Sequence, residues 1–332
     1  MTASEVRHAK VEVAMGYEQR ADAAAAAVLR SLIDVVGFNL EGAIAGEDVE
    51  YLHQLRIAVR RSRTVQRQFR GAFPALDLPG LRSDFRWLQR ATGQARDLDV
   101  HVEDFQELSE LVPASLRGAL EPLHVVLAEH RLRAREDLTR TLRSQRLQEL
   151  LADWERLLES LVELPVDDRP VAERSIGSLT GERVGAVYHR IIRMGEAIGE
   201  DSPAEDYHEL RKKGKDLRYL LELFGLRLFD HDVVEPLVRA LKGLQDLLGR
   251  HQDREVQSAL VRSLADEVAV LPGGPSACMA MGVLVDRLAA DERAARREFS
   301  ERFLALTSEE WRVQVAETFS RAAAGVEQRN GI

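Results

Sequence analysis

An internal repeat constrains this chain more than any other feature of its sequence. Residues 51–56 (YLHQLR) return as residues 206–211 (DYHELR), about 155 residues further along. Residues 86–93 are echoed by 242–249, and residues 128–136 by 290–298, in the same order and at nearly the same spacing. Such a repeat predicts a duplicated folding unit of about 160 residues. We therefore expect two halves, 1–165 and 166–332, that meet in the Pro-containing segment 164–170 and together form one unit.

The hydrophobic pattern is helical along most of the chain. Apolar residues recur at spacings of three and four within stretches rich in Ala, Leu, Glu and Arg, which is typical of amphipathic helices. The clearest stretches are 18–44, 52–69, 116–142, 183–198, 208–229 and 281–306. Runs with strand-like alternation are scarce, and short Pro- and Gly-containing breaks separate the helical stretches. The sequence thus predicts an all-α fold of two antiparallel four-helix-type bundles, related by the duplication with approximate two-fold symmetry.

The amino-acid composition indicates in which cellular compartment the protein is expected. The only cysteine, Cys278, excludes a disulfide framework and a Cys-rich zinc site. No apolar run reaches the roughly 18 residues of a membrane-spanning helix, and residues 1–15 carry charges in place of a signal-peptide core. We expect a cytoplasmic protein without a membrane partner, and the oligomeric state is left open. A net charge of -9 argues at first against an anionic ligand.

The first repeat, however, contains a strongly basic segment that could bind an anionic ligand. Residues 51–76 contain six Arg and neither Asp nor Glu. At about 100° per residue, five of these Arg and one His form a single stripe along a helix, with apolar residues on the opposite face. The stripe consists of His53, Arg56, Arg60, Arg63, Arg67 and Arg70.

The second repeat carries a shorter version of the same stripe. Its members are His208, Arg211, Lys212, Lys215 and Arg218. Lys213 and Asp216 fall outside the stripe, Gly214 lies within the basic segment, and Glu222 takes the place that Arg67 has in the first repeat. We leave open whether the two repeats contribute equally to binding.

Other basic residues recur in the repeats or lie beside the matched segments, and they are candidates to complete a groove. These are Arg86, Arg90, Arg131, Arg135, Arg190, Lys242, Arg293 and Arg297. A surface salt bridge is the alternative role for each of them.

A like-charged stripe that occurs twice predicts a ligand with many regularly spaced negative charges. Ordinary solvated helix faces mix acids and bases so that they pair at three- and four-residue spacings. Arg binds phosphate oxygens in a bidentate way, and Lys adds a compact positive charge. Because residues 51–76 alone carry six positive charges, the negative net charge belongs to the rest of the chain, where it favours solubility.

These motifs resemble the CHAD family, the conserved histidine α-helical domain. The resemblance lies in HxLRxxxRRxR at residues 53–63, HxLRKxxKxxR at 208–218 and LKxLQxxLGxxQD at 241–253, and it extends over about residues 17–325. It implies two four-helix bundles with basic inner surfaces that bind inorganic polyphosphate, and association with polyphosphate granules. Members often carry a CYTH domain with an alternating Glu-x-Glu-x-Lys motif. No such motif occurs here, so the resemblance implies a stand-alone, non-catalytic binding protein without a cofactor.

Two other classes of function remain as alternatives. Basic helices could bind nucleic acid, although the nearest aromatic residues for base stacking are only Trp87 and Tyr219. The spacings Glu50-x-x-His53 and Glu205-x-x-His208 match those of di-metal helical bundles, but cations follow each His on the same helix side and would repel a metal. We expect no catalytic residue and no metal site, because neither a Walker A motif nor an evident nucleophile occurs.

Overall fold

The computed structural model describes residues 6–324, and regular secondary structure in this range is helical. The described part contains no β-strand, only one isolated antiparallel bridge between Arg20 and Ser175. The all-α fold class predicted from the sequence is therefore confirmed. Residues 1–5 and 325–332, which the predicted halves include, lie outside the described residues.

Within the described residues 6–163, the chain forms eight α-helices joined by short turns and 3-10 segments. The α-helices are α1 (Ala21–Ala45), α2 (Val49–Gln68), α3 (Leu78–Ala91), α4 (Gly93–Glu103), α5 (Phe105–Glu110), α6 (Ala114–Arg117), α7 (Glu121–Leu142) and α8 (Gln145–Ser160). The 3-10 segments are η1 (Arg70–Ala72), η2 (Gly118–Leu120) and η3 (Leu161–Glu163).

The C-terminal part contains two much longer helices. Its elements are α9 (Ile176–Glu196), α10 (Ala204–Leu220), the π-helical turn η4 (Leu221–Gly225), α11 (Leu226–Leu228), α12 (His231–Ser263), α13 (Ala265–Ala269), α14 (Gly274–Thr307) and α15 (Glu309–Ala324).

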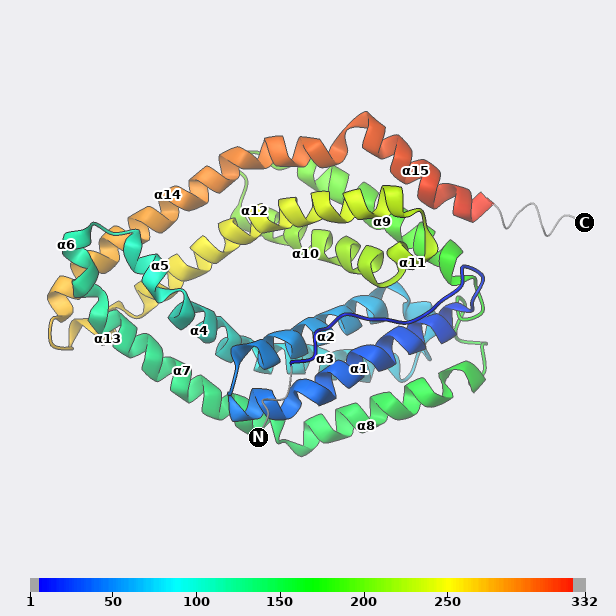
Figure 1. Ribbon diagram of the computed structural model, residues 1–332, viewed down its shortest axis with the longest axis horizontal. Coiled ribbons are helices and arrows are strands. Elements are labelled where there is room, and N and C mark those ends of the chain that lie inside the picture. Colours follow the sequence, from blue (N-terminus) through cyan, green and yellow to red (C-terminus); the bar gives the residue numbers. More distant parts are fainter. Residues whose placement is uncertain (1–5, 325–332) are drawn as a thin grey trace, which may run out of the picture.

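The two parts lie on either side of a central opening. In Figure 1 α1, α2, α3, α7 and α8 form the lower side, α9, α10, α12, α14 and α15 form the upper side, and α5, α6 and α13 lie together at the left end. Helix α1 packs along α2, and α12 packs along α14. The two sides touch at both ends, where α7 meets α13 and α14, and where α1 and α2 meet α9 and α10. The duplication, the two-fold symmetry and the division at residue 165 stay predictions.

Local sequence signals explain where the helices that carry the basic stripes begin. Helix α2 starts after Asp48, whose carboxylate accepts a hydrogen bond from the backbone N–H of Glu50 at 2.8 Å. Before it, α1 ends at Gly46, which takes the left-handed conformation with φ of 70° that glycine tolerates best. These two residues set the short connection that folds α2 back along α1.

Helix α1 is apolar because it lies in the core. It is long and apolar enough to cross a membrane by length and composition alone. More than half of its most apolar stretch is buried inside the protein, where it packs against α2, α8 and η3. It also carries buried polar residues with partners, such as Asn39, which exchanges hydrogen bonds with the backbone of Arg7. Packing in the fold therefore accounts for its composition.

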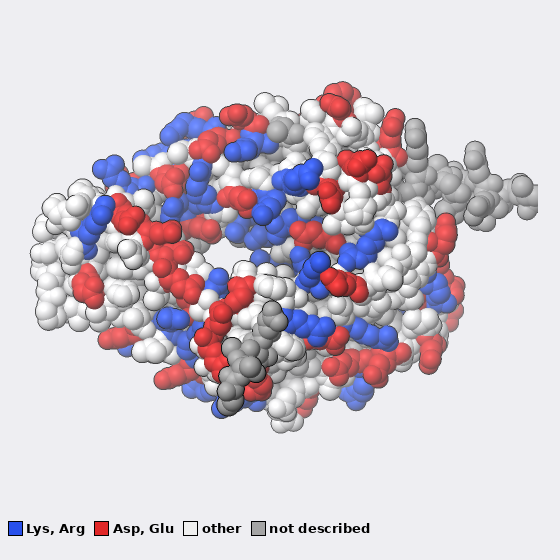
Figure 2. All heavy atoms as spheres, viewed as in Figure 1, with Lys and Arg blue, Asp and Glu red and all other residues white. Residues whose placement is uncertain are grey.

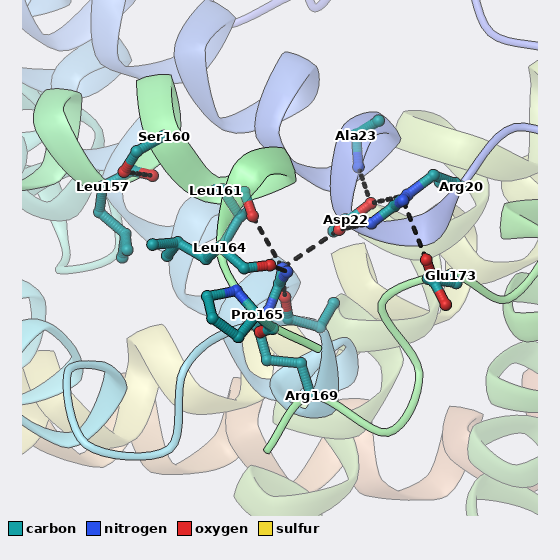
Figure 3. A network of polar contacts seen from close by, with 11 residues as sticks. Arg20, Asp22, Ala23, Leu157, Ser160, Leu161, Leu164, Pro165, Arg169 and Glu173 are labelled. Carbon is teal, nitrogen blue, oxygen red and sulfur yellow. Dashed lines mark hydrogen bonds and ion pairs between the residues drawn. The ribbon is translucent and has the colours of Figure 1, made fainter. Parts of the chain in front are cut away.

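A buried arginine ties the segment between the two parts to the N-terminal helices (Figure 3). The Arg169 and Asp22 side chains are both fully buried and form an ion pair at 3.1 Å. The same guanidinium donates to the carbonyl oxygens of Leu161 at 2.8 Å and Pro165 at 2.9 Å, and also to that of Leu164. Ala72 accepts a further bond at 3.4 Å, so this one side chain serves four carbonyl oxygens and the Asp22 carboxylate, which also accepts bonds from Arg20 and from the backbone N–H of Ala23.

Replacing Arg169 by Met should lower the free energy of unfolding by roughly 3–5 kcal/mol, because the Asp22 carboxylate loses its buried cation and keeps only the partly exposed Arg20, while several carbonyls lose a donor. Chemical denaturation monitored by circular dichroism measures this change. The control is Arg174→Met, which removes a solvent-exposed ion pair with Glu182 and should change stability by less than about 1 kcal/mol. Similar losses in both variants would show that the network does not have this role.

Candidate functional site

Helices α2 and α10 bring the two basic stripes together. The two helices contact each other across the molecule. Leu55 and Val59 on α2, and Leu210 and Leu217 on α10, are fully buried in the core. The opposite, cationic faces therefore turn away from the cores and toward the space between the helices.

A hollow of about 380 Å³ lies between these faces, and we call it the basic hollow. Seven of its lining residues belong to the predicted stripes: Arg60, Arg63, Arg67, His208, Arg211, Lys212 and Lys215. The rest of the lining is Thr64, Gln89, Lys213, Asp216 and Tyr219. Figure 2 shows Lys and Arg side chains gathered along the upper and right edges of the central opening. The structure thus combines cations from both repeats in a single site.

Ion pairs between the two parts hold the helices beside this hollow. Arg67 on α2 donates to the Asp216 carboxylate on α10, which also accepts from the Thr64 hydroxyl at 3.4 Å. Burial raises the pKa of Asp216, and the nearby Arg67 opposes that shift. Arg61 pairs with Glu222, the residue that interrupts the second stripe. Glu222 is therefore a structural partner of the first repeat.

The centre of the basic hollow lacks neutralising carboxylates. Within the described part of the chain, neither Arg60 nor Lys215 forms an ion pair. Burial lowers the pKa of the Lys215 ammonium to about 7. Repulsion from Arg60, Arg211 and Arg218 adds to that shift. A partly buried ammonium that lies near three arginines and has no carboxylate partner is a favourable place for an anion.

Two arginines of the first stripe are positioned by α3. Arg63 donates to the side-chain oxygen of Gln89. Arg56 donates from Nη1 to the backbone oxygen of Gln89 and to the Thr92 hydroxyl, both at 2.9 Å. Burial lowers the pKa of Arg56 to about 10. Arg56 is thus a buried anchor between α2 and α3 and does not line the basic hollow, whereas Arg63 does.

The two predicted histidines differ in their surroundings. Burial lowers the pKa of His53, and repulsion from Arg96 adds to the shift. His208 lines the basic hollow and is hydrogen-bonded through Nδ1 to Gln252. The structure places His208 at the site, while His53 lies outside the lining of the hollow.

Arg131 and Arg135 are bound to a carboxylate on a neighbouring helix. Both donate to the fully buried Asp99 on α4, Arg131 at 2.8 Å and Arg135 at 2.7 Å. This contact joins α7 to α4. The remaining predicted residues are exposed and line neither the basic hollow nor its neighbour: Arg86, Arg90, Arg190, Lys242, Arg293 and Arg297.

A second hollow, of about 480 Å³, adjoins the first and shares Arg211 and Lys215 with it. Arg218 completes its lining from α10. The other walls come from α12 and from the α4–α5 region, and they include several carboxylates. We call it the mixed hollow because both signs of charge line it.

Sequence reasoning missed some lining residues for identifiable reasons. Lys213 and Asp216 fall off the stripe on a helical projection, yet they line the basic hollow because α2 approaches α10 from that side. Gln89 and Gln245 line the basic and the mixed hollow, respectively. Both lie in the repeated segments 86–93 and 242–249, so the repeat was the signal that could have identified them.

The His residues that suggested a metal bundle are not grouped with further ligands. Nowhere in residues 6–324 do three His, Cys, Asp or Glu side chains lie close enough together to hold a metal ion. Around His53 the neighbouring charges include Arg56, Arg60 and Arg96. Direct coordination in the manner of a di-metal bundle finds no support in this arrangement.

Comparisons with known proteins place the chain in a family. Its fold is similar to that of the CHAD domain from the plant Ricinus communis, with a TM-score of 0.77, 22% sequence identity, and coverage of 92% of this chain and 99% of the other. It is also similar to PptA from Streptomyces chartreusis, with a TM-score of 0.67, 20% identity, and coverage of 86% and 99%. No curated protein sequence matches it. The CHAD-domain family model matches residues 27–262, and the chain therefore belongs to the CHAD-domain family.

Proposed function

We propose that this protein binds inorganic polyphosphate in the basic hollow, without hydrolysing it. The observation that carries the proposal is the meeting of Arg60 and Lys215, from two different repeats, in a hollow where neither has a carboxylate partner. Such a site favours a ligand that supplies several negative charges at close spacing. The resemblance noted from the sequence motifs points to the same ligand.

Polyphosphate suits this geometry because it is narrow and carries charge on every unit. Arg60 and Arg63 can offer planar guanidinium groups to phosphate oxygens, and Lys215 can offer a point charge. The adjoining hollow continues the cationic lining through Arg211 and Arg218. A flexible chain of phosphates could therefore contact both hollows in succession, which would explain why the cations extend over two sites.

The proposal of binding without catalysis rests on the side chains around the hollow. Among the described residues, Thr64 and Tyr219 alone contribute hydroxyl groups to its lining. The Thr64 hydroxyl is hydrogen-bonded to Asp216, which itself pairs with Arg67. Release of phosphate from polyphosphate by the purified protein, abolished by Arg60→Glu, would contradict this part of the proposal. A role on polyphosphate granules would follow from binding alone.

Replacing both Arg60 and Arg63 by Glu should weaken polyphosphate binding by at least about a hundredfold, because two charge-assisted contacts become repulsive. Titration calorimetry with size-defined polyphosphate measures the dissociation constant. The matched control is Arg140→Glu with Arg156→Glu, which makes the same charge change on exposed helix faces of α7 and α8. Equal weakening by both pairs would mean that only net charge matters, and the hollow would then not be the site.

Affinity should fall as the pH rises above 7, through deprotonation of Lys215. Its pKa is about 7 in the free protein, and a bound polyanion raises that pKa because it stabilises the ammonium form. The contribution of Lys215 is therefore fully present below pH 7 and is lost between pH 7 and the higher pKa of the complex. We expect a loss of about tenfold across this window. Calorimetry in buffers of different ionisation enthalpy should also detect proton uptake on binding.

The Lys215→Arg variant provides the decisive comparison for this pH effect. Arginine stays charged throughout the window, so the variant should bind with nearly constant affinity between pH 7 and 9. A pH dependence that survives unchanged in Lys215→Arg would assign the effect to another group.

Nucleic acid is the second candidate, and the structure makes it less suitable. Tyr219 is buried, with the Arg61 and Arg218 guanidinium groups 5.5 and 5.4 Å from its ring centre. The face of Trp87 is covered by Arg146 at 4.2 Å. Neither ring is free to stack on a base. Single-stranded DNA of equal charge should therefore compete poorly with polyphosphate at matched salt, and equal competition would favour nucleic acid instead.

A further inference from the structure

The mixed hollow has a basic wall that is only partly neutralised. Arg211, Lys215 and Arg218 form this wall from α10. The nearest carboxylate to Arg211 is that of Asp253, at 3.9 Å, and Arg218 lies 3.5 Å from Glu222. The Nε atoms of both arginines are buried and have no hydrogen-bond partner. These cations can accept further negative charge.

The remaining walls of the mixed hollow carry four carboxylates beside two arginines, Arg250 and Arg254. Asp246 and Asp253 line it from α12, and Asp104 and Glu107 line it from the α4–α5 region. Asp246, Asp104 and Glu107 form no ion pair with any residue in the range 6–324. Figure 2 shows acidic side chains gathered at the left of the central opening, where α4 and α5 lie in Figure 1. Four carboxylates thus share the hollow with five cations, and among these described lining residues only Asp253 pairs with one of the cations, Arg211 at 3.9 Å.

The arginines of α12 do not neutralise these acids. Arg250 pairs with Glu298 at 2.7 Å, and Arg254 pairs with Asp291 at 2.7 Å. Both partners lie on α14, so these two ion pairs connect the long helices. Of the two α12 carboxylates in the hollow, Asp246 forms no ion pair within the described residues, and Asp253 has only the 3.9 Å contact with Arg211.

A buried amide without partners lines the same hollow. Gln245 is 5% exposed, and neither its Nε2 nor its Oε1 atom has a hydrogen-bond partner. An unpaired buried amide is costly. Its donor can serve a phosphate oxygen, and its acceptor can serve a water molecule bound to a cation. This side chain is an observation independent of the acidic residues, and it indicates that the hollow takes a polar ligand.

Polyphosphate without a counterion matches only the basic wall of the mixed hollow. A phosphate on the basic wall would face Asp246 and Asp253, and like charges at short range repel. A ligand that matches both walls carries its negative charge toward α10 and positive charge toward α12 and α5. Phosphate groups that hold a divalent cation have this order of charges.

We propose that the mixed hollow binds a hydrated Mg²⁺ ion carried by the polyphosphate, between the phosphates and the Asp246 and Asp253 carboxylates. This inference rests on the proposed function and adds the form in which the ligand is bound. Asp246 and Asp253 are seven residues apart on α12, which places them two turns apart on one helix face. Arg211 and Lys215 then contact the phosphate oxygens, and the ion lies on the acidic side.

Outer-sphere binding agrees with the spacing of the side chains. Within the described residues no three ligating side chains converge on one point. Mg²⁺ keeps several of its waters and is commonly held by one or two carboxylates together with substrate phosphates. A volume of about 480 Å³ corresponds to roughly sixteen water molecules, enough for a hydrated ion beside phosphate groups.

The test compares dissociation constants for size-defined polyphosphate with MgCl₂ and with KCl at equal ionic strength. The informative variant is Asp246→Asn with Asp253→Asn, which keeps the side-chain shapes. The control is Asp137→Asn with Asp153→Asn, which removes two exposed carboxylates from α7 and α8. Because Mg²⁺ also shields polyphosphate in solution, the readout is the ratio of the two dissociation constants for each protein.

For the α12 variant we expect the dissociation constant in MgCl₂, divided by that in KCl, to be about tenfold higher than for the wild type. Removing side chains that hydrogen-bond to the ligands of a metal ion has effects of this size. In KCl alone the variant should bind as tightly as the wild type or more tightly, because repulsion is removed. The control should keep the wild-type ratio. Mn²⁺ used as a probe should be retained with polyphosphate on the wild-type protein after gel filtration, and less so on the variant.

The outcomes separate this inference from the proposed function. An unchanged ratio in the α12 variant, with intact binding in KCl, would overturn the Mg²⁺ site alone. If the variant gained affinity equally in both salts, the Asp246 and Asp253 carboxylates would only repel the ligand, and the Mg²⁺ site would be overturned too. No polyphosphate binding by the wild type in either salt would overturn the proposed function itself.

Discussion

Repulsion between cations of α2 and α10 is the constraint on which the site depends. Arg60 and Lys215 come from different repeats and face a common hollow without carboxylate partners. Two ion pairs, Arg67 with Asp216 and Arg61 with Glu222, hold the same helices together beside them. The attraction between the helices is thus separated in space from the repulsion, and this separation leaves an anion site in the folded protein.

Carboxylates decide which of the many arginines remain able to bind a ligand. Asp99 binds both Arg131 and Arg135, and Asp22 binds the buried Arg169. These arginines stabilise contacts between segments. The protein can therefore combine an overall charge of -9 with a cationic site. Elsewhere acidic residues pair with structural arginines, whereas Asp216 is the one acidic residue among the described residues that line the basic hollow.

The helix faces were predictable from the sequence, but the pairing between helices was not. The spacing of apolar residues and the residues that cap a helix depend only on the nearby sequence. The boundaries of α2 therefore lie close to the predicted 52–69, and its apolar face is buried as expected. Glu222 looked like a defect in the second stripe, yet it serves Arg61 from 161 residues away. Such a partner depends on how two helices meet. The same holds for the break between α3 and α4, where the matching region of the second repeat runs on as the single helix α12.

The lowered pKa of Lys215 links folding to binding. Its value of about 7 lies below the ordinary value of 10.5, so between these pH values the folded protein binds fewer protons than the unfolded chain. Folding stability from this group therefore falls as the pH is lowered through that range. A bound polyanion raises the pKa again and removes the penalty. Burial of Lys215 and its repulsion from neighbouring arginines therefore destabilise the free protein, and replacing this lysine by an uncharged residue should stabilise the protein at the expense of affinity.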